Sequence, residues 1–321
     1  MRYNIYLVSE QQRLVPGTLW PQAVAATARA RAGGALQPIV TTQTIVEDQG
    51  IPFLVRVLAG RAGRAAIEQK QVNANIDTAP SAVAPVSAAA AAAAPAFDPF
   101  LPYEPDMFVA DISPTHVCLL NKFNVIDHHL LVVTRAFEEQ DAAINAADFR
   151  ALWTCMAEVD GLAFYNAGKL AGASQRHKHL QIAPLPWGPA SRRLPVEDAL
   201  AVDELGDEPR LRTWPYMHAA LRLDAAWLSD AETAGERLLA KYVALLQVFD
   251  IKIDRQGLLP PYNLLATREW MVLVPRRHEE FEGIAVNALG FAGSLLVRSD
   301  AQLAYLREIG PLAVLREVGM K

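Results

Sequence analysis

The stretch NAGKLAGASQRHKHLQIAPLP, residues 166–186, holds two of the seven histidines of the chain, His177 and His179, followed by Gln181. Side chains two residues apart on a β-strand point to the same face, so these three predict one polar face. Lys178, between the histidines, is expected on the opposite face. Prolines end the stretch and small residues precede it. It therefore predicts a strand that presents two imidazoles and a carboxamide behind a loop of small residues.

Three interpretations of this strand compete. It can be a polar strand that faces solvent, a metal site, or a catalytic strand. Zinc normally takes three or four protein ligands, and the other histidines show no ligand spacing with this pair, so we predict no metal site. A neutral imidazole is a good nucleophile toward phosphorus and a good leaving group, which suits covalent nucleotidyl transfer. That chemistry needs one ring nitrogen to be held as a donor, which fixes the tautomer.

The loop before the histidines suits a phosphate. Gly172 and Ala173 allow backbone amides to approach a phosphate closely. Ser174 and Gln175 add side-chain donors, and Asn166 can hydrogen-bond a ribose or a phosphate. The net charge of −5 gives no global attraction to nucleic acid or to an anionic membrane surface. We therefore expect a local anion site and neither of those two partners.

Composition places the chain among ordinary globular proteins. Its 321 residues include 52% hydrophobic and 20% charged residues. Cys118 and Cys155 lie in apolar surroundings and form no CxxC pair, which favours reduced thiols in a cytoplasmic protein. The N-terminus has no signal-peptide pattern, and no apolar stretch is long enough to span a bilayer.

Hydrophobic periodicity predicts strands joined by hairpins, with helices between them. This pattern favours an antiparallel α+β architecture over a doubly wound one. We expect strands at 107–112, 116–124, 128–135, 162–168 and 177–186, a hairpin at 262–277, and helices at 146–160, 231–250 and 300–318, the last interrupted at Gly310 and Pro311.

The chain also shows a faint internal repeat. The strand–turn–strand pattern of 118–135 is similar to that of 263–277. Asn166-Ala167, followed by Ala171-Gly172 and Ser174, is similar to 287–294, which has no His-x-His after it. The repeat is either chance, because alanine and glycine are common here, or a degenerate duplication with chemistry in the first half alone.

At these residues the chain resembles the transferase branch of the histidine triad superfamily. YNAGKLAGASQRHKHLQI (165–182) resembles the signature of the diadenosine tetraphosphate phosphorylases, also called ATP adenylyltransferases. The stretches 100–135, 262–276 and 281–298 are similar to that family as well, so the resemblance covers most of residues 40–300. The third position of the triad supports this branch, because the hydrolases carry a histidine where this chain has Gln181.

The resemblance implies an α+β fold of histidine-triad-like antiparallel sheets with flanking helices. Two degenerate halves would lie in one chain as a pseudo-dimer, as in galactose-1-phosphate uridylyltransferase. We expect a single adenylyltransferase unit over 1–321, with a catalytic half at about 98–190 and a second half at about 225–300. Residues 79–97, rich in alanine and proline, are expected to be an inserted connector.

The resemblance also implies roles for individual residues. His179 would attack the α-phosphorus, the backbone carbonyl of His177 would orient it, and Gln181 would help to hold the phosphate oxygens. The loop would cradle the phosphates through Asn166, Gly172, Ala173, Ser174 and Gln175. Further substrate contacts would come from Arg56, Asn121, Lys122, Asn263, Met271 and Arg276.

The implied function is phosphorolysis of diadenosine tetraphosphate to ADP and ATP, reversibly, through an adenylyl-histidine on His179. Alternatives with the same intermediate are an ADP-sulfate phosphorylase and a dinucleoside polyphosphate hydrolase. A nucleotide-binding regulator without catalysis and a metal-binding scaffold are the non-enzyme alternatives. We expect nucleotides and phosphate as ligands, Mg²⁺ to escort the polyphosphate, no organic cofactor, and a monomer.

Overall fold

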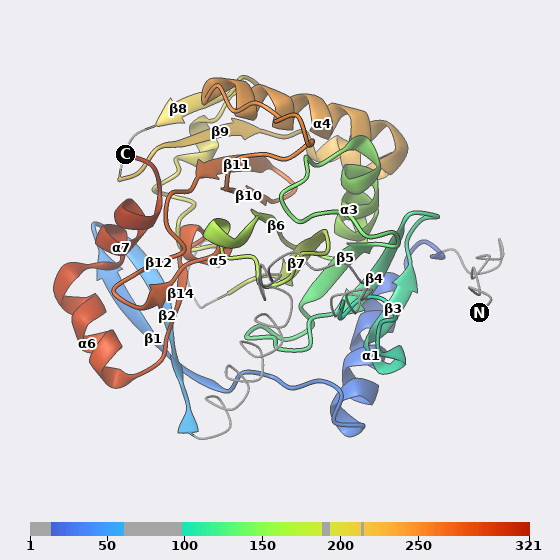
Figure 1. Ribbon diagram of the computed structural model, residues 1–321, viewed down its shortest axis with the longest axis horizontal. Helices are drawn as coiled ribbons and strands as arrows, with labels where there is room; N and C mark the ends of the chain where they lie inside the picture. Colours follow the sequence, from blue (N-terminus) through green and yellow to red (C-terminus); the bar gives the residue numbers. More distant parts are fainter. Residues whose placement is uncertain (1–13, 61–97, 188–192, 213–214) are drawn as a thin grey trace, which may run out of the picture.

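The computed structural model describes residues 14–60, 98–187, 193–212 and 215–321 (Figure 1). The helices are α1 (Leu19–Ala32), α3 (Ala146–Glu158), α4 (Ala231–Val248), α5 (Ala288–Phe291), α6 (Asp300–Ile309) and α7 (Pro311–Val318). The strands are β1 (Thr41–Asp48), β2 (Ile51–Leu58), β3 (Phe108–Asp111), β4 (His116–Leu120), β5 (Leu130–Thr134), β6 (Gly161–Ala167), β7 (His179–Pro184), β8 (Arg210–Arg212), β9 (His218–Arg222), β10 (Tyr262–Ala266), β11 (Trp270–Pro275), β12 (Glu280–Phe281), β13 (Ile284–Ala285) and β14 (Ser294–Val297).

One nine-stranded sheet forms the centre of the molecule, in the order β3-β4-β5-β7-β6-β10-β11-β9-β8. All of its strand pairs are antiparallel. The order β4-β5-β7-β6 on one side mirrors β8-β9-β11-β10 on the other, and β6 pairs with β10 where the two halves meet. Each half also carries one long helix between equivalent strands, α3 and α4. The predicted antiparallel α+β fold with two halves in one chain is confirmed.

The stretches that we paired from the sequence are not the equivalent ones. By position in the mirrored order, the hairpin β10–β11 corresponds to β6 and β7 and not to β4 and β5. Residues 287–294 form α5 and the start of β14, outside the nine-stranded sheet, so their likeness to 166–174 does not reflect a shared place in the two halves.

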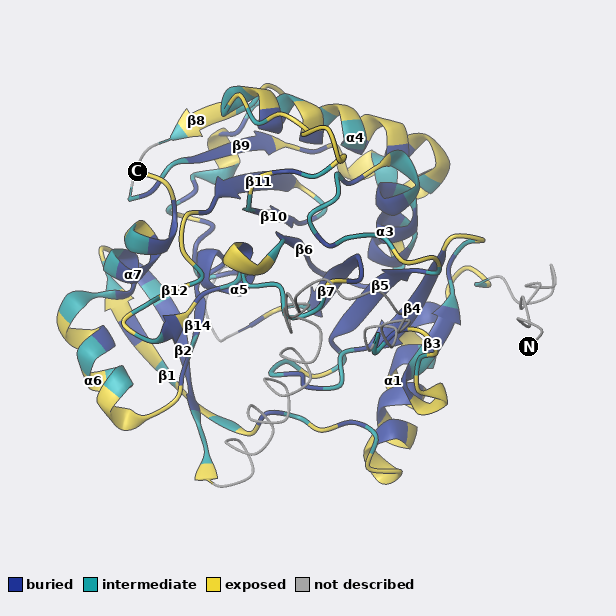
Figure 2. Ribbon diagram, viewed as in Figure 1, coloured by how far each residue is buried: buried dark blue, intermediate teal, exposed yellow. Residues whose placement is uncertain are grey.

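Different layers cover the two faces of the sheet (Figures 1 and 2). Helices α1, α3 and α4 pack with one face into the larger apolar cluster. The other face packs against a three-stranded sheet, β1-β2-β14, and against α7. Alternation along the strands decides which side chain enters which layer: Tyr165 and Leu180 join the first cluster, while Phe164 joins the second.

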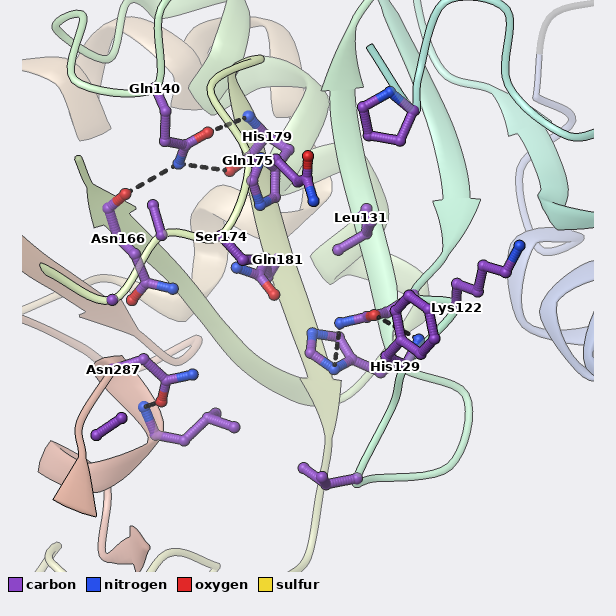
Figure 3. Close-up of a pocket in the computed structure, with 18 of the residues that line it drawn as sticks. Lys122, His129, Leu131, Gln140, Asn166, Ser174, Gln175, His179, Gln181 and Asn287 are labelled. Atoms are coloured by element: carbon purple, nitrogen blue, oxygen red, sulfur yellow. Dashed lines mark hydrogen bonds between the residues drawn. The ribbon is translucent and has the colours of Figure 1, made fainter. Parts of the chain in front are cut away.

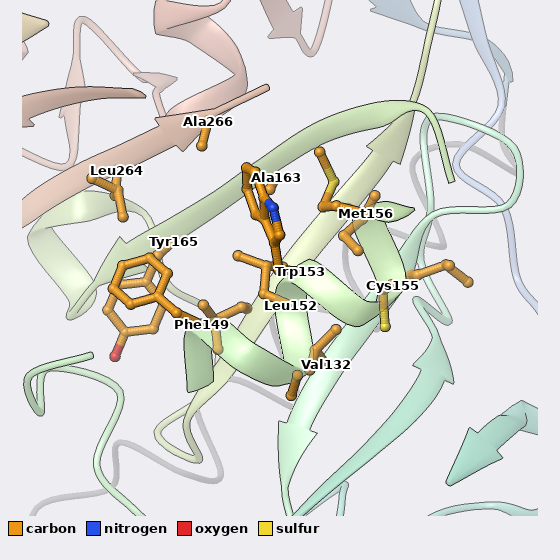
Figure 4. Packing of buried hydrophobic residues seen from close by; sticks show 14 of the residues in the cluster. Val132, Phe149, Leu152, Trp153, Cys155, Met156, Ala163, Tyr165, Leu264 and Ala266 are labelled. Carbon is orange, nitrogen blue, oxygen red and sulfur yellow. The ribbon is translucent and has the colours of Figure 1, made fainter. Parts of the chain in front are cut away.

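Helix α3 shows how the sequence fixes the first layer. The Asn145 side chain accepts from the Asp148 amide at the N-terminus of α3, and the Asn145 amide donates to Asp148 Oδ2. Together these two hydrogen bonds form a capping box. Figure 4 shows Phe149, Leu152 and Trp153 of α3 against side chains of β5, β6 and β10. Because β6 and β10 come from different halves, this helix ties the halves together.

The structure agrees with most of the expected elements and refines two of them. Regular strand pairing of β7 begins at His179, while His177 forms an isolated bridge with Glu139. The C-terminal helix is divided into α6 and α7 at Gly310, as its Gly-Pro pair predicts. The connector predicted at 79–97 lies outside the described residues. In the part of the chain that the structure describes, no helix combines the length and apolar character needed to cross a bilayer.

Candidate active site

A pocket of about 1080 Å³ opens over the first half of the large sheet (Figure 3). The small sheet, α5 and the loop after β6 form its other walls. Ten of the predicted site residues line it: Arg56, Asn121, Lys122, Asn166, Gly172, Ala173, Ser174, Gln175, His179 and Gln181. Residues far apart in the sequence therefore meet at one cavity, whose volume exceeds that of most sites for small ligands.

His179 begins strand β7 and is held from two directions. Its backbone amide donates to Gln140 Oε1 over 2.9 Å, and its Nδ1 lies 2.8 Å from the carbonyl oxygen of His177. A carbonyl only accepts, so Nδ1 carries the proton and the lone pair resides on Nε2. The carbonyl contact predicted from the family resemblance is therefore present, in the tautomer that a nucleophile requires.

His177 lies behind His179 and does not line the pocket. Its side chain is 1% exposed, with Nδ1 at 2.7 Å from Asp98 Oδ2 and Nε2 at 2.7 Å from the carbonyl oxygen of Thr134. Phe100 packs against both imidazoles, with ring centroids 5.6 Å from His177 and 5.4 Å from His179. His177 is thus in a position to support His179 and not to contact substrate.

Lys178 points to the opposite face, as the strand alternation predicts. Its Nζ lies 2.6 Å from Asp148 Oδ2, and Asp148 Oδ1 lies 2.9 Å from His116 Nε2. All three side chains are buried. Contacts with His116 and Lys178 lower the pKa of Asp148, although burial alone would raise it. Lys178 is therefore held in a buried ion pair behind the sheet and is not available to a phosphate.

The loop after β6 makes two turns that need glycine. Gly168 has φ +77° and Gly172 has φ +88°, both in the left-handed region. A Cβ on Gly172 would lie 2.8 Å from the Asn287 Cβ and 2.8 Å from the Val286 carbonyl oxygen. The Ala173 amide donates to the Gly168 carbonyl and closes the turn. This close approach places Ser174 and Gln175 at the pocket.

Three residues predicted to contact substrate do not line the pocket: Asn263, Met271 and Arg276. For Met271 the reason is the alternation of side chains along its strand. Met271 is fully buried in the cluster beneath α3 and α4, on the sheet face opposite the pocket. On a strand, a residue one position along faces the other way, and one sequence cannot reveal which face bears the site.

Asn263 and Arg276 are also buried, and they hold the loop instead. Asn263 Nδ2 donates to Asn166 Oδ1 and to the Ala171 carbonyl, each over 2.8 Å. Arg276 Nη1 donates to Asn263 Oδ1 over 2.6 Å, and its guanidinium lies over the Phe291 ring. Burial lowers the pKa of Arg276 to about 9. These two residues therefore position Asn166 and the loop from behind.

The basic residues of the pocket come from separate elements. Arg56, on β2, is 6% exposed, and its Nε donates to Ser294 Oγ over 3.4 Å. Burial lowers the pKa of Arg56 below its usual value. Lys122 forms an ion pair with Glu104 at 2.5 Å. The Arg56 guanidinium and the Lys122 ammonium are two of the five cationic side chains that the described residues bring to the cavity, the others being Lys169, Arg176 and Arg298.

Several lining residues were not predicted from the sequence. Gln140 links β6 and β7, because its Nε2 also donates to the Asn166 and His179 carbonyls over 3.0 and 3.2 Å. Asn287 and Ser294 reach the pocket from the C-terminal segment, and His129 lies beside Asn121. Gln140, Asn287 and Ser294 gave no local signal, because only tertiary contacts bring them to the cavity.

No group of three or more histidine, cysteine, aspartate or glutamate side chains that could hold a metal ion occurs within residues 14–60, 98–187, 193–212 and 215–321. The two thiols, Cys118 and Cys155, are buried and free. Hydrogen bonding with Cys118, together with burial, raises the pKa of the Cys155 thiol. The polar groups that line the pocket are imidazole, carboxamide, hydroxyl, backbone amide and cationic side chains, together with the carboxylates of Glu104, Glu139, Asp141 and Glu279.

Fold and site together define a histidine-triad-like protein of the glutamine-bearing, transferase type. Two family models match the chain: the Ap4A phosphorylase N-terminal domain over residues 9–202 and the ATP adenylyltransferase C-terminal domain over residues 212–321. The chain belongs to the Ap4A phosphorylase family, where Ap4A is diadenosine tetraphosphate. The resemblance read from the His-x-His-x-Gln stretch is confirmed.

Relatives in Saccharomyces cerevisiae support this assignment. Diadenosine 5',5'''-P1,P4-tetraphosphate phosphorylase 2 is 29% identical over 241 residues, 66% of this chain and 72% of that protein. Protein APA1 is 30% identical over 223 residues, 64% of this chain and 68% of that protein. The crystal structure of yeast Ap4A phosphorylase Apa2 matches with a TM-score of 0.69 at 22% identity and covers 95% of both chains, which shows a shared fold.

Proposed function

We propose that this protein catalyses phosphorolysis of Ap4A, yielding ATP and ADP, reversibly and through an adenylyl group carried on His179. The observation that carries the proposal is the fixed tautomer of His179 at a pocket of about 1080 Å³. The pocket is large enough for two nucleosides joined by a phosphate chain. A solved structure of the yeast relative holds Ap4A, and another holds AMP.

The first step forms a phosphorus–nitrogen bond. His179 Nε2 attacks the α-phosphorus of one adenosine, the bond to the bridging oxygen breaks, and ATP leaves with that oxygen. The imidazole becomes an adenylyl-imidazolium, and its Nδ1–H donates more strongly to the His177 carbonyl. The Ser174 hydroxyl and the backbone amides of the glycine turn would donate hydrogen bonds to the phosphoryl oxygens, where negative charge is redistributed during transfer.

In the second step an oxygen of inorganic phosphate attacks the same phosphorus, and the phosphorus–nitrogen bond breaks. ADP leaves and His179 returns to its neutral tautomer. Gln181, 8% exposed and on the same face as His179, offers a carboxamide, which cannot act as an acid or base near neutral pH. Without a general base at Gln181 to activate water, the adenylyl-histidine reacts preferentially with phosphate, which is already an anion.

Mg²⁺ enters this proposal as part of the substrate, because four linked phosphates need charge neutralisation. The pocket lining adds little net positive charge, because, among the described residues, its five cationic side chains (Arg56, Lys122, Lys169, Arg176 and Arg298) are accompanied by four carboxylates (Glu104, Glu139, Asp141 and Glu279). We also propose a monomer, supported by the presence of both halves of the sheet in one chain. The two free buried thiols support a reducing, cytoplasmic location.

Product identification tests the function. The purified protein is incubated with Ap4A, Mg²⁺ and phosphate, and the nucleotides are separated. ATP and ADP in equal amounts are expected. ATP with AMP would show hydrolysis, and phosphate-independent turnover would overturn the phosphorylase assignment. Replacement of Ap4A by adenylyl sulfate tests the remaining alternative, in which sulfate leaves and phosphate again gives ADP; that alternative gains support only if this reaction is faster.

A further inference from the structure

Asp98 is a partly buried carboxylate that the proposed chemistry does not use. It lies immediately before the Pro99-Phe100 pair and is 17% exposed in its side chain. Oδ1 accepts from the Phe100 amide over 2.9 Å, which fixes the orientation of the carboxylate. Oδ2 is thereby aimed at His177 Nδ1, at 2.7 Å. Asp98 does not line the pocket, so any effect on the reaction passes through another residue.

His177 faces an acceptor at each ring nitrogen. Besides the Asp98 carboxylate at Nδ1, the Thr134 carbonyl oxygen lies 2.7 Å from Nε2, and the Thr134 hydroxyl lies 3.0 Å from the same atom. The Thr134 hydroxyl can donate to the Lys178 carbonyl, 3.4 Å away. A neutral imidazole has one N–H, so either neutral tautomer would set a lone pair against the Asp98 carboxylate or the Thr134 carbonyl. The imidazolium satisfies both, and both bonds have the short lengths of charge-assisted pairs.

Among the neighbours of His177, Asp98 is the group that can balance the positive charge of the imidazolium. Phe100 and Phe137 pack edge-on against the His177 ring, with centroids at 5.6 and 5.5 Å. Of the charged neighbours in sequence, Lys178 pairs with Asp148 on the other face of the sheet, and Arg176 pairs with Glu139. The Asp98 carboxylate is therefore the anion in direct contact with the ring.

We propose that Asp98 is a positioning residue for adenylyl transfer. It holds the His177 ring as a double donor between Asp98 and Thr134, and this keeps the His177 carbonyl oxygen directed at His179 Nδ1. The same turn places Phe100 against His179, with ring centroids 5.4 Å apart. One carboxylate thus fixes both the hydrogen-bond acceptor and the apolar support of the nucleophile. This inference rests on the proposed function of His179.

The test compares Asp98→Ala with Asp98→Asn. Alanine removes the contact, whereas the asparagine amide can donate to Nδ1 of a neutral His177 and so retains a contact without the ion pair. The matched control is Asp250→Asn, because Asp250 pairs with Lys252 at 2.9 Å on an exposed surface. Adenylyl-enzyme formation from labelled Ap4A, kcat and KM are measured, and His177 is observed by nitrogen NMR after histidine labelling and assignment with His177→Gln.

We expect Asp98→Ala to lower kcat and the rate of adenylyl-enzyme formation by about 100-fold, with KM changed by less than about threefold, because a misoriented nucleophile slows the chemical step. Asp98→Asn should lose less. Its His177 should show one protonated nitrogen, where the wild type shows two. Asp250→Asn should behave as the wild type does.

Three results would overturn the inference: kcat of Asp98→Ala close to that of the wild type, a change confined to KM, or a singly protonated His177 in the wild type. If Asp98→Ala does not fold, Asp98→Asn and the NMR comparison still decide. Failure of the wild type to convert Ap4A would instead contradict the proposed function, and the protonation state of His177 would remain readable independently.

Discussion

At the scale of single residues, the two imidazoles of the His-x-His pair have different surroundings. Both lie on one strand, yet His179 reaches the pocket while His177 is enclosed by Asp98, Thr134 and two phenylalanines. The hydrogen bond from Nδ1 to a backbone carbonyl suits His179 to the nucleophilic role that we propose for it, because it leaves the lone pair on Nε2.

His179→Ala removes the nucleophile and little else. We expect kcat to fall by about four orders of magnitude or more, since removal of a covalent nucleophile has effects of that size. Affinity for a non-reactive Ap4A analogue should stay within about tenfold, a difference of ~1.4 kcal/mol, measured by calorimetry. His278→Ala, at an exposed position, is the control. Turnover like that of the wild type would contradict the adenylyl-histidine mechanism.

Gln181→His tests whether the third triad position selects the acceptor. An imidazole can shuttle a proton to or from water near neutral pH, and a carboxamide cannot. The ratio of AMP to ADP formed from Ap4A in the presence of phosphate should therefore rise. Gln181→Asn keeps the carboxamide and should leave the ratio low. An unchanged ratio in Gln181→His would show that phosphate wins for reasons outside this residue.

At the scale of elements, the glycine turn after β6 is held by contact with the segment before α5. Gly172→Ala meets two obstacles: a left-handed φ of +88° and atoms of residues 286 and 287 at 2.8 Å. We expect a loss of unfolding free energy of about 1–2 kcal/mol from the dihedral and ~1–3 kcal/mol more from the overlap. Phosphate affinity should fall as well, because the turn places Ser174 at the pocket.

Gly257→Ala is the matched control for Gly172→Ala. Gly257 has φ +86°, but nothing lies within 4 Å of a Cβ built there. Its cost should be the dihedral part alone. Urea unfolding of the two variants compares them directly. Equal losses of unfolding free energy would show that residues 286 and 287 move away from the added methyl group without a free-energy cost.

The sequence indicated which residues of β7 and of the preceding turn reach the pocket, but not which residues hold that turn from behind. Alternation along β7 and the small residues before it are local signals, so His179, Gln181 and the turn were placed correctly in the pocket. Asn263 and Arg276 were expected at the substrate because the family resemblance implied it, yet both donate to backbone and side-chain acceptors behind the loop. Which polar group is already satisfied depends on tertiary contacts.

At the scale of the whole molecule, the two halves differ at the strand position that β7 occupies in the first half. Strand β11 mirrors β7 in the sheet order, but its residues are WMVLVP, with no histidine or glutamine. Trp270, Val272 and Val274 face the small sheet and α7 and belong to the second apolar cluster. The face that forms a pocket in the first half is therefore filled by the C-terminal segment in the second.

A buried histidine in that second half makes the stability of the whole fold depend on pH. His218 is 4% exposed on β9, and burial lowers its pKa from 6.5. At pH 7.5 and above the imidazole is almost entirely neutral in both the folded and unfolded states, and stability is hardly affected. As pH falls through 6.5 towards the lowered folded pKa, the unfolded chain binds the proton first, so unfolding free energy decreases.

His218→Gln should remove that dependence. Between pH 7.5 and pH 5.5 the wild type should lose more unfolding free energy than the variant, by up to about 1 kcal/mol, since one pKa unit corresponds to ~1.4 kcal/mol. Urea unfolding at each pH gives the values. His278→Gln, at an exposed position, should keep the slope of the wild type. Parallel curves for the wild type and His218→Gln would show that another group carries the acid sensitivity, because only a proton uptake that differs between folded and unfolded His218 produces a difference in slope.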